Sequence, residues 1–315
     1  MFFSDPKKYA EEQNNKRSKL DGNKKKSDYI KTTSICLFAS ELACLIGLNT
    51  YKKPSETILR IWQKNFTTDF KKTKKRLEED DEEELALIET RNEKFSRISN
   101  KLDTKKKEEV KITMEKCLEA KDVNSMINLR KDVLKECEDL PNKDRKEILD
   151  TIYDITNTNF GTKNENKSVH IYTQMTGEPV IKIDKFMKRM IYKDEGYEWF
   201  IGGKVDGILK DNTIIEVKNR MYKLFREVRE YEKIQTYAYM FALYSKKSQL
   251  VETYMNGKAP EVNIIDVKFE QIYWDYIVNR ILIFINYFNK FMKSKKLKKK
   301  MLVEGADNYN IDIFD

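Results

Sequence analysis

Histidine and paired cysteines are almost missing from this 315-residue sequence. Its one histidine, His170, argues against any site that needs two histidines, a Ser-His-Asp triad or a histidine-bearing metal finger. The four cysteines, none of them in a C-x-x-C pair, are Cys36, Cys44, Cys117 and Cys137. This scatter argues against a zinc ribbon, an iron–sulfur cluster and a disulfide framework, and it is typical of reduced intracellular thiols.

Long hydrophobic runs are missing as well. Apolar runs such as Ile281 to Ile285 are far too short to cross a bilayer, and the N-terminal MFFSDPKKYA has no apolar core of signal-peptide length. We therefore expect a soluble, intracellular protein without membrane contact.

Glycine is missing between residues 55 and 158, where Pro141 is the single proline. Blocks of positive and negative charge alternate there, and Ile88, Phe95 and Leu102 recur at heptad spacing. The pattern predicts a helical hairpin or short coiled coil, with the charges on a solvated face. We interpret 55–157 as an all-helical insertion.

Positive charge is abundant, with a net charge of +9, while 40% of the residues are hydrophobic. The chain is therefore long and apolar enough to bury a core, and its charge suits a polyanionic partner. A lysine-rich solvated surface is the simpler alternative. Residues 1–30 are predicted to be a flexible basic arm, and 293–315 a basic C-terminal tail.

The remaining segments, 31–54 and 158–292, have a mixed pattern that predicts an α/β domain with a mixed sheet. Helices are expected at 34–48, 163–176, 222–244 and 271–292, and strands at 180–183, 199–209, 213–218, 249–254 and 262–267.

The stretch GGKVDGILKDNTIIEVKNR, residues 202–220, carries the main candidate site. Because side chains alternate across a strand, Glu216 and Lys218 share one face. A three-residue loop centred on Asp211 places Leu209 opposite Thr213, and hence Asp206 opposite Glu216. Directly opposed residues have Cβ atoms roughly 4.5–5.5 Å apart.

Two carboxylates this close repel each other unless a cation lies between them. A divalent metal such as Mg²⁺ would fit, because it binds carboxylate and carbonyl oxygens, and it could activate a water for attack on a phosphate. Lys218 would orient that water or stabilise the developing charge. The glycines before Lys204 would allow close approach of a nucleic-acid backbone.

The short Glu-x-Lys string is weak on its own, because Glu109-Val110-Lys111 repeats it within the charged helical segment. The second copy differs in context, since it follows a glycine-entered strand and a turn. The alternative is a solvent-facing cross-strand ion pair without chemistry.

Four further residues are candidates, each with a structural alternative. Glu165 shares the apolar face of its helix, but Thr162 three residues before it completes a capping-box pattern. Gln235 and Tyr239 are one helical turn apart, where Gln235 could bind a metal's water or a phosphate, or could be an ordinary polar core residue. Ser40 could cap a helix or lie at a phosphate site.

Taken together, these segments resemble the PD-(D/E)xK nuclease superfamily, and within it the lambda-exonuclease or YqaJ-like viral recombinase nucleases. The resemblance rests on FASELACLIGLNTY at 38–51, FGTKNE at 160–165, the D-G…E-V-K hairpin and the Gln-x-x-x-Tyr helix. It implies a restriction-endonuclease-like core, with a mixed central sheet flanked by helices and interrupted by the large all-helical insertion. Val205 replaces the proline of the motif's name, and the arginine expected upstream of the first segment is absent.

The resemblance also implies roles for single residues. Mg²⁺ or Mn²⁺ would be held by Asp206, Glu216, the Val217 carbonyl and Glu165. Lys218 would serve the nucleophilic water, and Gln235 would support the site. The implied DNA contacts are Lys31, Ser40, Lys52, Arg220 and Tyr239. A second acidic residue before Asp206 would be Asp194 or Glu195.

The implied activity is that of a metal-dependent DNA exonuclease working 5′ to 3′ on duplex DNA, in recombination, replication or repair of a virus or mobile element. Its implied partners are DNA, a single-strand annealing protein and further copies of the chain, in a host cytoplasm or nucleus. A structure-specific endonuclease with the same site, or a non-catalytic nucleic-acid-binding or scaffold protein, are the alternatives.

Overall fold

The computed structural model describes residues 32–79, 85–86, 88–120, 122–194, 196–255, 259–306, 308–309 and 313–314. The predicted basic arm at 1–30, Lys31 and Glu195 lie outside the described residues. No helix in the described ranges is both long and apolar enough to pass through a bilayer.

A three-stranded sheet, which we call sheet A, has the order β1-β3-β2. Its strands are β1 (Thr33–Phe38), β2 (Met187–Lys193) and β3 (Tyr197–Gly203). β1 runs parallel to β3, and β2 runs antiparallel to it. The helix expected from residue 34 was therefore wrong over its first turn, because Ile35 and Leu37 alternate into the core as strand residues. The short helices η1 (Ala39–Glu41) and α2 (Leu42–Leu45) follow.

A four-stranded sheet, sheet B, has the order β4-β5-β6-β7. Its strands are β4 (Gly207–Ile208), β5 (Ile214–Arg220), β6 (Lys247–Tyr254) and β7 (Glu261–Lys268). β5 and β6 are parallel and the other pairs are antiparallel, so the sheet is mixed as predicted. The strand expected over 199–209 instead breaks at 204–206 and contributes to both sheets. The break brings Asp206 to the junction between them.

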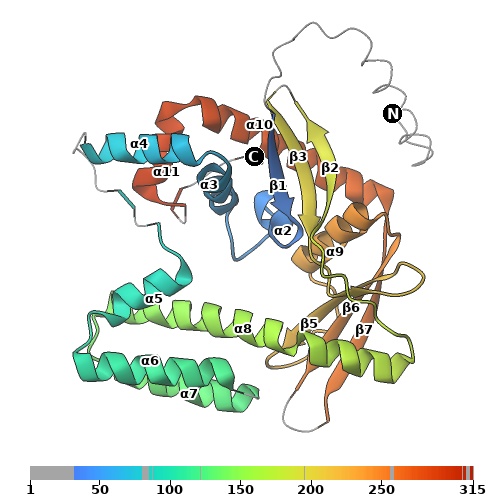
Figure 1. The fold of residues 1–315 in the computed structure, drawn as a ribbon, viewed down its shortest axis with the longest axis horizontal. Coiled ribbons are helices and arrows are strands. Elements are labelled where there is room, and N and C mark those ends of the chain that lie inside the picture. The colour runs from blue at the N-terminus through green and yellow to red at the C-terminus, as the bar shows by residue number, and fades with distance from the viewer. Residues whose placement is uncertain are drawn as a thin grey trace, which may run out of the picture.

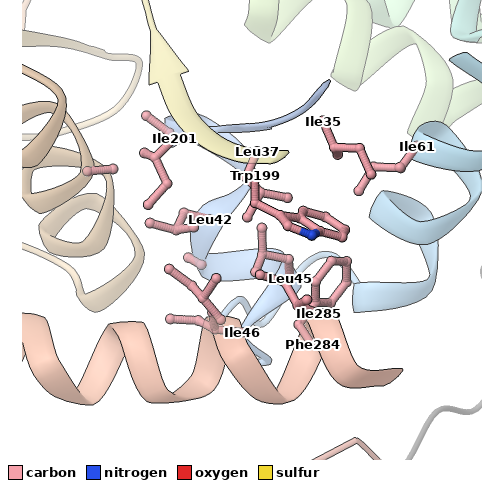
Figure 2. Packing of buried hydrophobic residues seen from close by; sticks show 14 of the residues in the cluster. Ile35, Leu37, Leu42, Leu45, Ile46, Ile61, Trp199, Ile201, Phe284 and Ile285 are labelled. Carbon is pink, nitrogen blue, oxygen red and sulfur yellow. The ribbon is translucent and has the colours of Figure 1, made fainter. Parts of the chain in front are cut away.

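Helix α9 (Glu230–Leu243) packs on both sheets, with contacts to β2 and β3 of sheet A and to β5 and β6 of sheet B. Beside sheet A lies the main core, in which Trp199, Leu45 and Ile285 pack together (Figure 2). The helix that carries Ile285, α10 (Gln271–Lys293), closes this core on one side. The α/β fold with mixed sheets flanked by helices is confirmed.

Three more helices join the same core: α3 (Pro54–Asn65), α4 (Thr67–Glu79) and α11 (Lys295–Glu304). Apart from Pro54, the first two fall inside the range 55–157 assigned to the insertion, and the third falls inside the range assigned to a basic tail. Lys298 of α11 is buried and pairs with Asp69 of α4, with Nζ and Oδ2 2.8 Å apart. The globular part of the chain therefore extends beyond the predicted core ranges.

The helical unit with its own core consists of α5 (Arg91–Ser99), α6 (Thr104–Glu119), α7 (Val123–Glu136) and the first half of α8 (Asn142–Thr176). The 35 residues of α8 span about 52 Å, because an α-helix rises 1.5 Å per residue. The N-terminal half of α8 packs with α5, α6 and α7, and its C-terminal half packs on sheet B (Figure 1). One continuous helix thus joins the insertion to the sheet that carries the candidate site.

Candidate active site

The hairpin between β4 and β5 has the predicted register. Gly207 pairs with Ile215 and Ile208 with Ile214, and the N–H of Leu209 donates to the carbonyl of Thr213 over 2.8 Å. The turn is fixed by the Asp211 carboxylate, which accepts a hydrogen bond from the N–H of Thr213. Continuing the same register sets Asp206 across from Glu216.

Asp206 lies against the open edge of β5. Its Oδ2 accepts a hydrogen bond of 2.7 Å from the N–H of Val217, at a position that the short strand β4 does not reach. Because the N–H and C=O of one strand residue point to the same side, the Val217 carbonyl faces this opening too. The charge of Asp206 also raises the pKa of Glu216, so two carboxylates and one carbonyl lie close together at the junction of the sheets.

A chain of hydrogen bonds continues from Glu216 into α9. The Lys218 ammonium donates to Oε1 of Glu216 over 2.8 Å and to Oε1 of Gln235 over 3.0 Å. Nε2 of Gln235 in turn donates to the Tyr239 hydroxyl over 3.2 Å. The i to i+4 spacing of Gln235 and Tyr239 places both on the helix face that covers β5. Gln235 thus helps to hold the lysine in place.

Glu165 is on α8, half-buried, beside these groups. The capping-box alternative is wrong, because residue 165 lies in the interior of a helix that begins at Asn142, far from any helix N-terminus. Burial raises the pKa of Glu165, and the nearby charge of Glu216 raises it further. Glu165 therefore belongs to the same electrostatic cluster as Glu216.

A buried polar network that the sequence did not reveal holds α8 against sheet B. Nδ2 of Asn219 donates to the carbonyl of Gly161 over 2.8 Å, and the hydroxyls of Ser168 and Thr253 both donate to Oδ1 of Asn219. These contacts flank Glu165 on its helix and fix its position over β5. In the sequence, Asn219 and Thr253 stand out only as polar residues within apolar strands, and that pattern does not indicate what they bind.

The acidic groups of the site share a raised pKa. Burial raises the pKa of Asp206 to about 6 and that of Glu216 to about 7, although Lys218 pulls in the opposite direction. For Lys218, burial lowers the pKa, but the hydrogen bond to Glu216 and the charges of Glu216, Glu232 and Asp206 together outweigh burial, and the net pKa is raised. The lysine is therefore a cation at neutral pH, which suits charge stabilisation rather than proton abstraction.

The donor set fits a hard divalent cation. Oε2 of Glu216 is buried and has no hydrogen-bond partner among the described residues, although burying a charged oxygen without a partner is costly. In the described ranges, no group of three or more His, Cys, Asp or Glu side chains could hold a metal ion by itself. Mg²⁺ needs only one or two carboxylates when water and substrate oxygens complete its shell, so Asp206, Glu216 and the Val217 carbonyl would be enough protein ligands.

Two of the expected DNA contacts are buried, and those expectations are wrong. Arg220 is 9% exposed and its guanidinium pairs with Glu232 and Glu252. Tyr239 is 6% exposed, and burial raises the pKa of its hydroxyl. Arg220 is the next inward residue of β5 after Lys218, so its charge is used inside the fold.

The other expected contacts have different outcomes. Lys52 is exposed in the loop before α3, and Ser40 is exposed within η1, where its side chain caps no helix. Asp194 accepts hydrogen bonds from the N–H groups of Gly196 and Tyr197, in the turn between β2 and β3. That turn is at the opposite end of β3 from the site, roughly 20 Å away, so Asp194 is excluded as a site residue.

Lys182 is a basic residue near the site that the sequence did not reveal. It is exposed, hydrogen-bonds Asn166 of α8, and lies close enough to lower the pKa of both Glu165 and Asp206. Its segment is tied to the hairpin by a two-way backbone bridge between Ile181 and Ile208. Nothing in the local sequence distinguished it from the many other lysines.

Neither the protein-family models nor the curated proteins give a match to this chain. Among solved structures, it is similar to an alkaline exonuclease (LHK-Exo) from Laribacter hongkongensis, at 13% identity and a TM-score of 0.36 over 58% of this chain and 88% of that one. A structure of LHK-Exo in complex with dAMP has a TM-score of 0.35 at 14% identity, covering 60% of this chain and 90% of that one. A phage-related exonuclease from Haemophilus somnus 129PT has 14% identity and a TM-score of 0.36, covering 44% of this chain and 72% of that one. Similarity at this level concerns the arrangement of elements and assigns no residue a role.

The raised pKa of Asp206 makes a stability prediction for the metal-free protein. The folded-state pKa of about 6 exceeds the ordinary 3.8, so this group favours folding below pH 3.8 and loses that contribution as the pH rises through 6. Asp206→Asn should therefore increase the free energy of unfolding at pH 8 by on the order of 1–3 kcal/mol, which a higher melting temperature would report. At pH 4 the melting temperature should change little. Mg²⁺ should then stabilise the original protein more than the variant.

The matched control for that measurement is Asp211→Asn, in the turn of the same hairpin. Hydrogen bonds from Thr213 lower the pKa of Asp211, so removing its charge should not stabilise the protein at pH 8. A melting temperature for Asp206→Asn at or below that of the original protein at pH 8 without metal would contradict the assignment.

Proposed function

We propose that this protein is a metal-dependent deoxyribonuclease that hydrolyses phosphodiester bonds at the junction of its two sheets. The observation that carries the proposal is the convergence of Asp206, Glu216 and the Val217 carbonyl beside a lysine that is held by Glu216 and Gln235. Oε2 of Glu216 is buried and has no hydrogen-bond partner among the described residues. An ion pair with Lys218 does not require such an oxygen, whereas a metal ligand needs a free oxygen to bind the ion.

Asp206 and Glu216 would hold the ion, with Glu165 across the opening from α8. Bound there, Mg²⁺ or Mn²⁺ would supply a water of lowered pKa and would offset charge on the scissile phosphate. Lys218 has three N–H groups, of which two donate to Glu216 and Gln235. The third is left to donate to the attacking water or to a phosphate oxygen, where a cation stabilises the charge that develops during hydrolysis.

We extend the proposal to exonucleolytic action, 5′ to 3′ on duplex DNA, in viral or mobile-element recombination, replication or repair. The support for this finer part is the resemblance of residues 38–51 and 160–165 to the lambda-exonuclease family. In this chain the first segment includes η1 and α2, and the second lies in the middle of α8. A single-strand annealing partner and self-association are proposed on the same ground.

The test is incubation of the purified protein with linear duplex DNA and, separately, with covalently closed circular DNA, each with Mg²⁺ or with EDTA. We expect shortening of the linear molecule only, and only with the metal. Cutting of the circle would replace the exonuclease by an endonuclease that uses the same site. Failure to cut either DNA with Mg²⁺ or Mn²⁺ would overturn the proposal and favour a non-catalytic binding protein.

A further inference from the structure

The outer face of sheet A, opposite to α9, ends in a pair of partly exposed aromatic rings. Phe186, which precedes β2, is 47% exposed, and its ring meets that of Phe38 edge-on with centroids 5.9 Å apart. Phe38 is the register partner of Gly202 in β3, and a Cβ added at Gly202 would be 2.8 Å from the Phe186 ring. Glycine at this position is therefore what allows Phe186 to lie on the sheet. We call Phe38 and Phe186 the aromatic corner.

The aromatic corner is connected to the candidate active site in two ways: through the contact of β3 with α9, and through short stretches of chain. Gly203, the neighbour of Gly202, packs on the opposite face against Tyr239, which belongs to the hydrogen-bond chain of Lys218. Asp206 is four residues from Gly202, a separation that the chain can span with at most about 14 Å. Lys182, whose charge acts on Glu165 and Asp206, precedes Phe186 by the same four residues.

Cations surround the corner. The Arg60 guanidinium lies 4.3 Å from the centre of the Phe38 ring, and the Lys64 ammonium lies 5.9 Å from it. Lys188 of β2 is exposed and pairs in register with Gly202 of β3. Lys182 and Lys185 are exposed in the segment leading to Phe186. Among the described residues, the acidic groups of the same segments are Glu41, which pairs with Arg60, and Asp184.

This combination has a specific chemical match. Aromatic rings within a positively charged surface bind single-stranded nucleic acid, because each base can stack on a ring while the cations attract the phosphates. A single exposed apolar side chain would be ordinary at a protein surface, whereas here two rings lie among several cations. A protein partner would use the rings alone, and the excess of cations around them favours a polyanion instead.

We propose that Phe186, supported by Phe38, stacks a base of single-stranded DNA whose neighbouring nucleotides lead to the junction of the two sheets. Lys182 and Lys188 contact its phosphates. The assignment of this strand as substrate rests on the proposed nuclease function. It would give the site a preference for DNA with an unpaired end, since a base within a duplex cannot stack on the ring.

The experiment measures binding of a fluorescein-labelled oligothymidylate by anisotropy, in EDTA so that no cleavage occurs. Phe186→Ala should weaken binding by about tenfold, because one base–aromatic stack contributes on the order of 1–3 kcal/mol. Phe186→Tyr should restore it. The matched control is Ile272→Ala on α10, which removes another large exposed apolar side chain and should leave the affinity unchanged.

A second measurement reports stacking directly. The three tryptophans of the chain, Trp62, Trp199 and Trp274, are buried, so Phe186→Trp introduces an exposed indole. Its fluorescence should be quenched by oligothymidylate and not by blunt duplex DNA. Oligouridylate in the same assay distinguishes DNA from RNA, and quenching by the RNA alone would overturn the assignment to DNA.

Equal affinity of Phe186→Ala and the original protein, with a normal melting temperature, would overturn the stacking proposal. So would an equal loss of affinity for blunt duplex DNA, or unchanged indole fluorescence. These outcomes are separable from the nuclease test. If the protein cleaves DNA and Phe186→Ala binds with normal affinity, only the stacking proposal is refuted. If binding depends on Phe186 but no DNA is cleaved, the nuclease proposal is refuted and a single-strand binding surface remains.

Discussion

Replacing Glu216 with glutamine is expected to reduce DNA cleavage by more than about 100-fold, since the substitution removes the charge that would hold the metal and orient Lys218. Glutamine matches the volume of glutamate, so the hairpin should stay folded. Oε2 of Glu216 has no hydrogen-bond partner among the described residues, so no protein contact of that atom is lost. Loss of linear duplex DNA with Mg²⁺ is the activity readout, and anisotropy with the same DNA in EDTA reports binding, which should be largely retained.

The chain offers a matched control for this variant. Glu109-Val110-Lys111 repeats the same three residues, but it lies on helix α6, where Glu109 is partly exposed and makes a helix-surface pair with Lys105. Glu109→Gln should therefore cleave DNA at the original rate. Full cleavage by Glu216→Gln would show that the charged hairpin is only structural, and full cleavage by Lys218→Ala as well would exclude this site from the chemistry.

Arg220→Met is expected to lower the free energy of unfolding by about 3–5 kcal/mol, which is typical of removing one partner from a buried ion pair. Nη1 and Nη2 of Arg220 bind both carboxylate oxygens of Glu232, and Nε binds Glu252. Glu232 is 1% exposed and Glu252 is fully buried, so the variant leaves two buried carboxylates without their cation. Chemical denaturation followed by circular dichroism measures the loss.

The control for Arg220→Met is Lys223→Met, in the connection between β5 and α9. Lys223 is exposed, so its substitution should change the unfolding free energy by no more than about 0.5 kcal/mol. An unchanged midpoint for Arg220→Met would mean that the Arg220–Glu232–Glu252 cluster does not stabilise the fold. Because Glu232 and Gln235 are about one turn apart near the start of α9, a fall in cleavage should accompany the fall in stability.

The hairpin was predictable because its determinants are local. Strand alternation put Glu216 and Lys218 on one face, and the loop of three residues set the register that places Asp206 across from Glu216. The structure adds how that register is held, through the Asp211 carboxylate and an Asn212 with a φ of 68°, a left-handed conformation that asparagine adopts more readily than most residues.

The wrong expectations share one physical origin. Ile35 and Leu37 lie in a stretch whose apolar pattern fits a helix, yet they form a strand because β3 supplies a parallel partner from far along the chain. Arg220 and Tyr239 were expected at the surface, but α9 carries Tyr239 and packs on both sheets, which buries both side chains. Glu165 had the sequence of a helix cap, but α8 begins 23 residues earlier, at Asn142, because its first half packs in the insertion.

The sequence by itself determined the class of fold, the hairpin that unites Asp206, Glu216 and Lys218, and the pairing of Gln235 with Tyr239, because each depends on periodicity or on a short turn. Only the tertiary structure decided which charges remain accessible. It buried Arg220 between two glutamates, brought Glu165 and Lys182 to the hairpin, and set Phe186 over Gly202. Those placements depend on contacts between segments far apart in the chain, which no local pattern encodes.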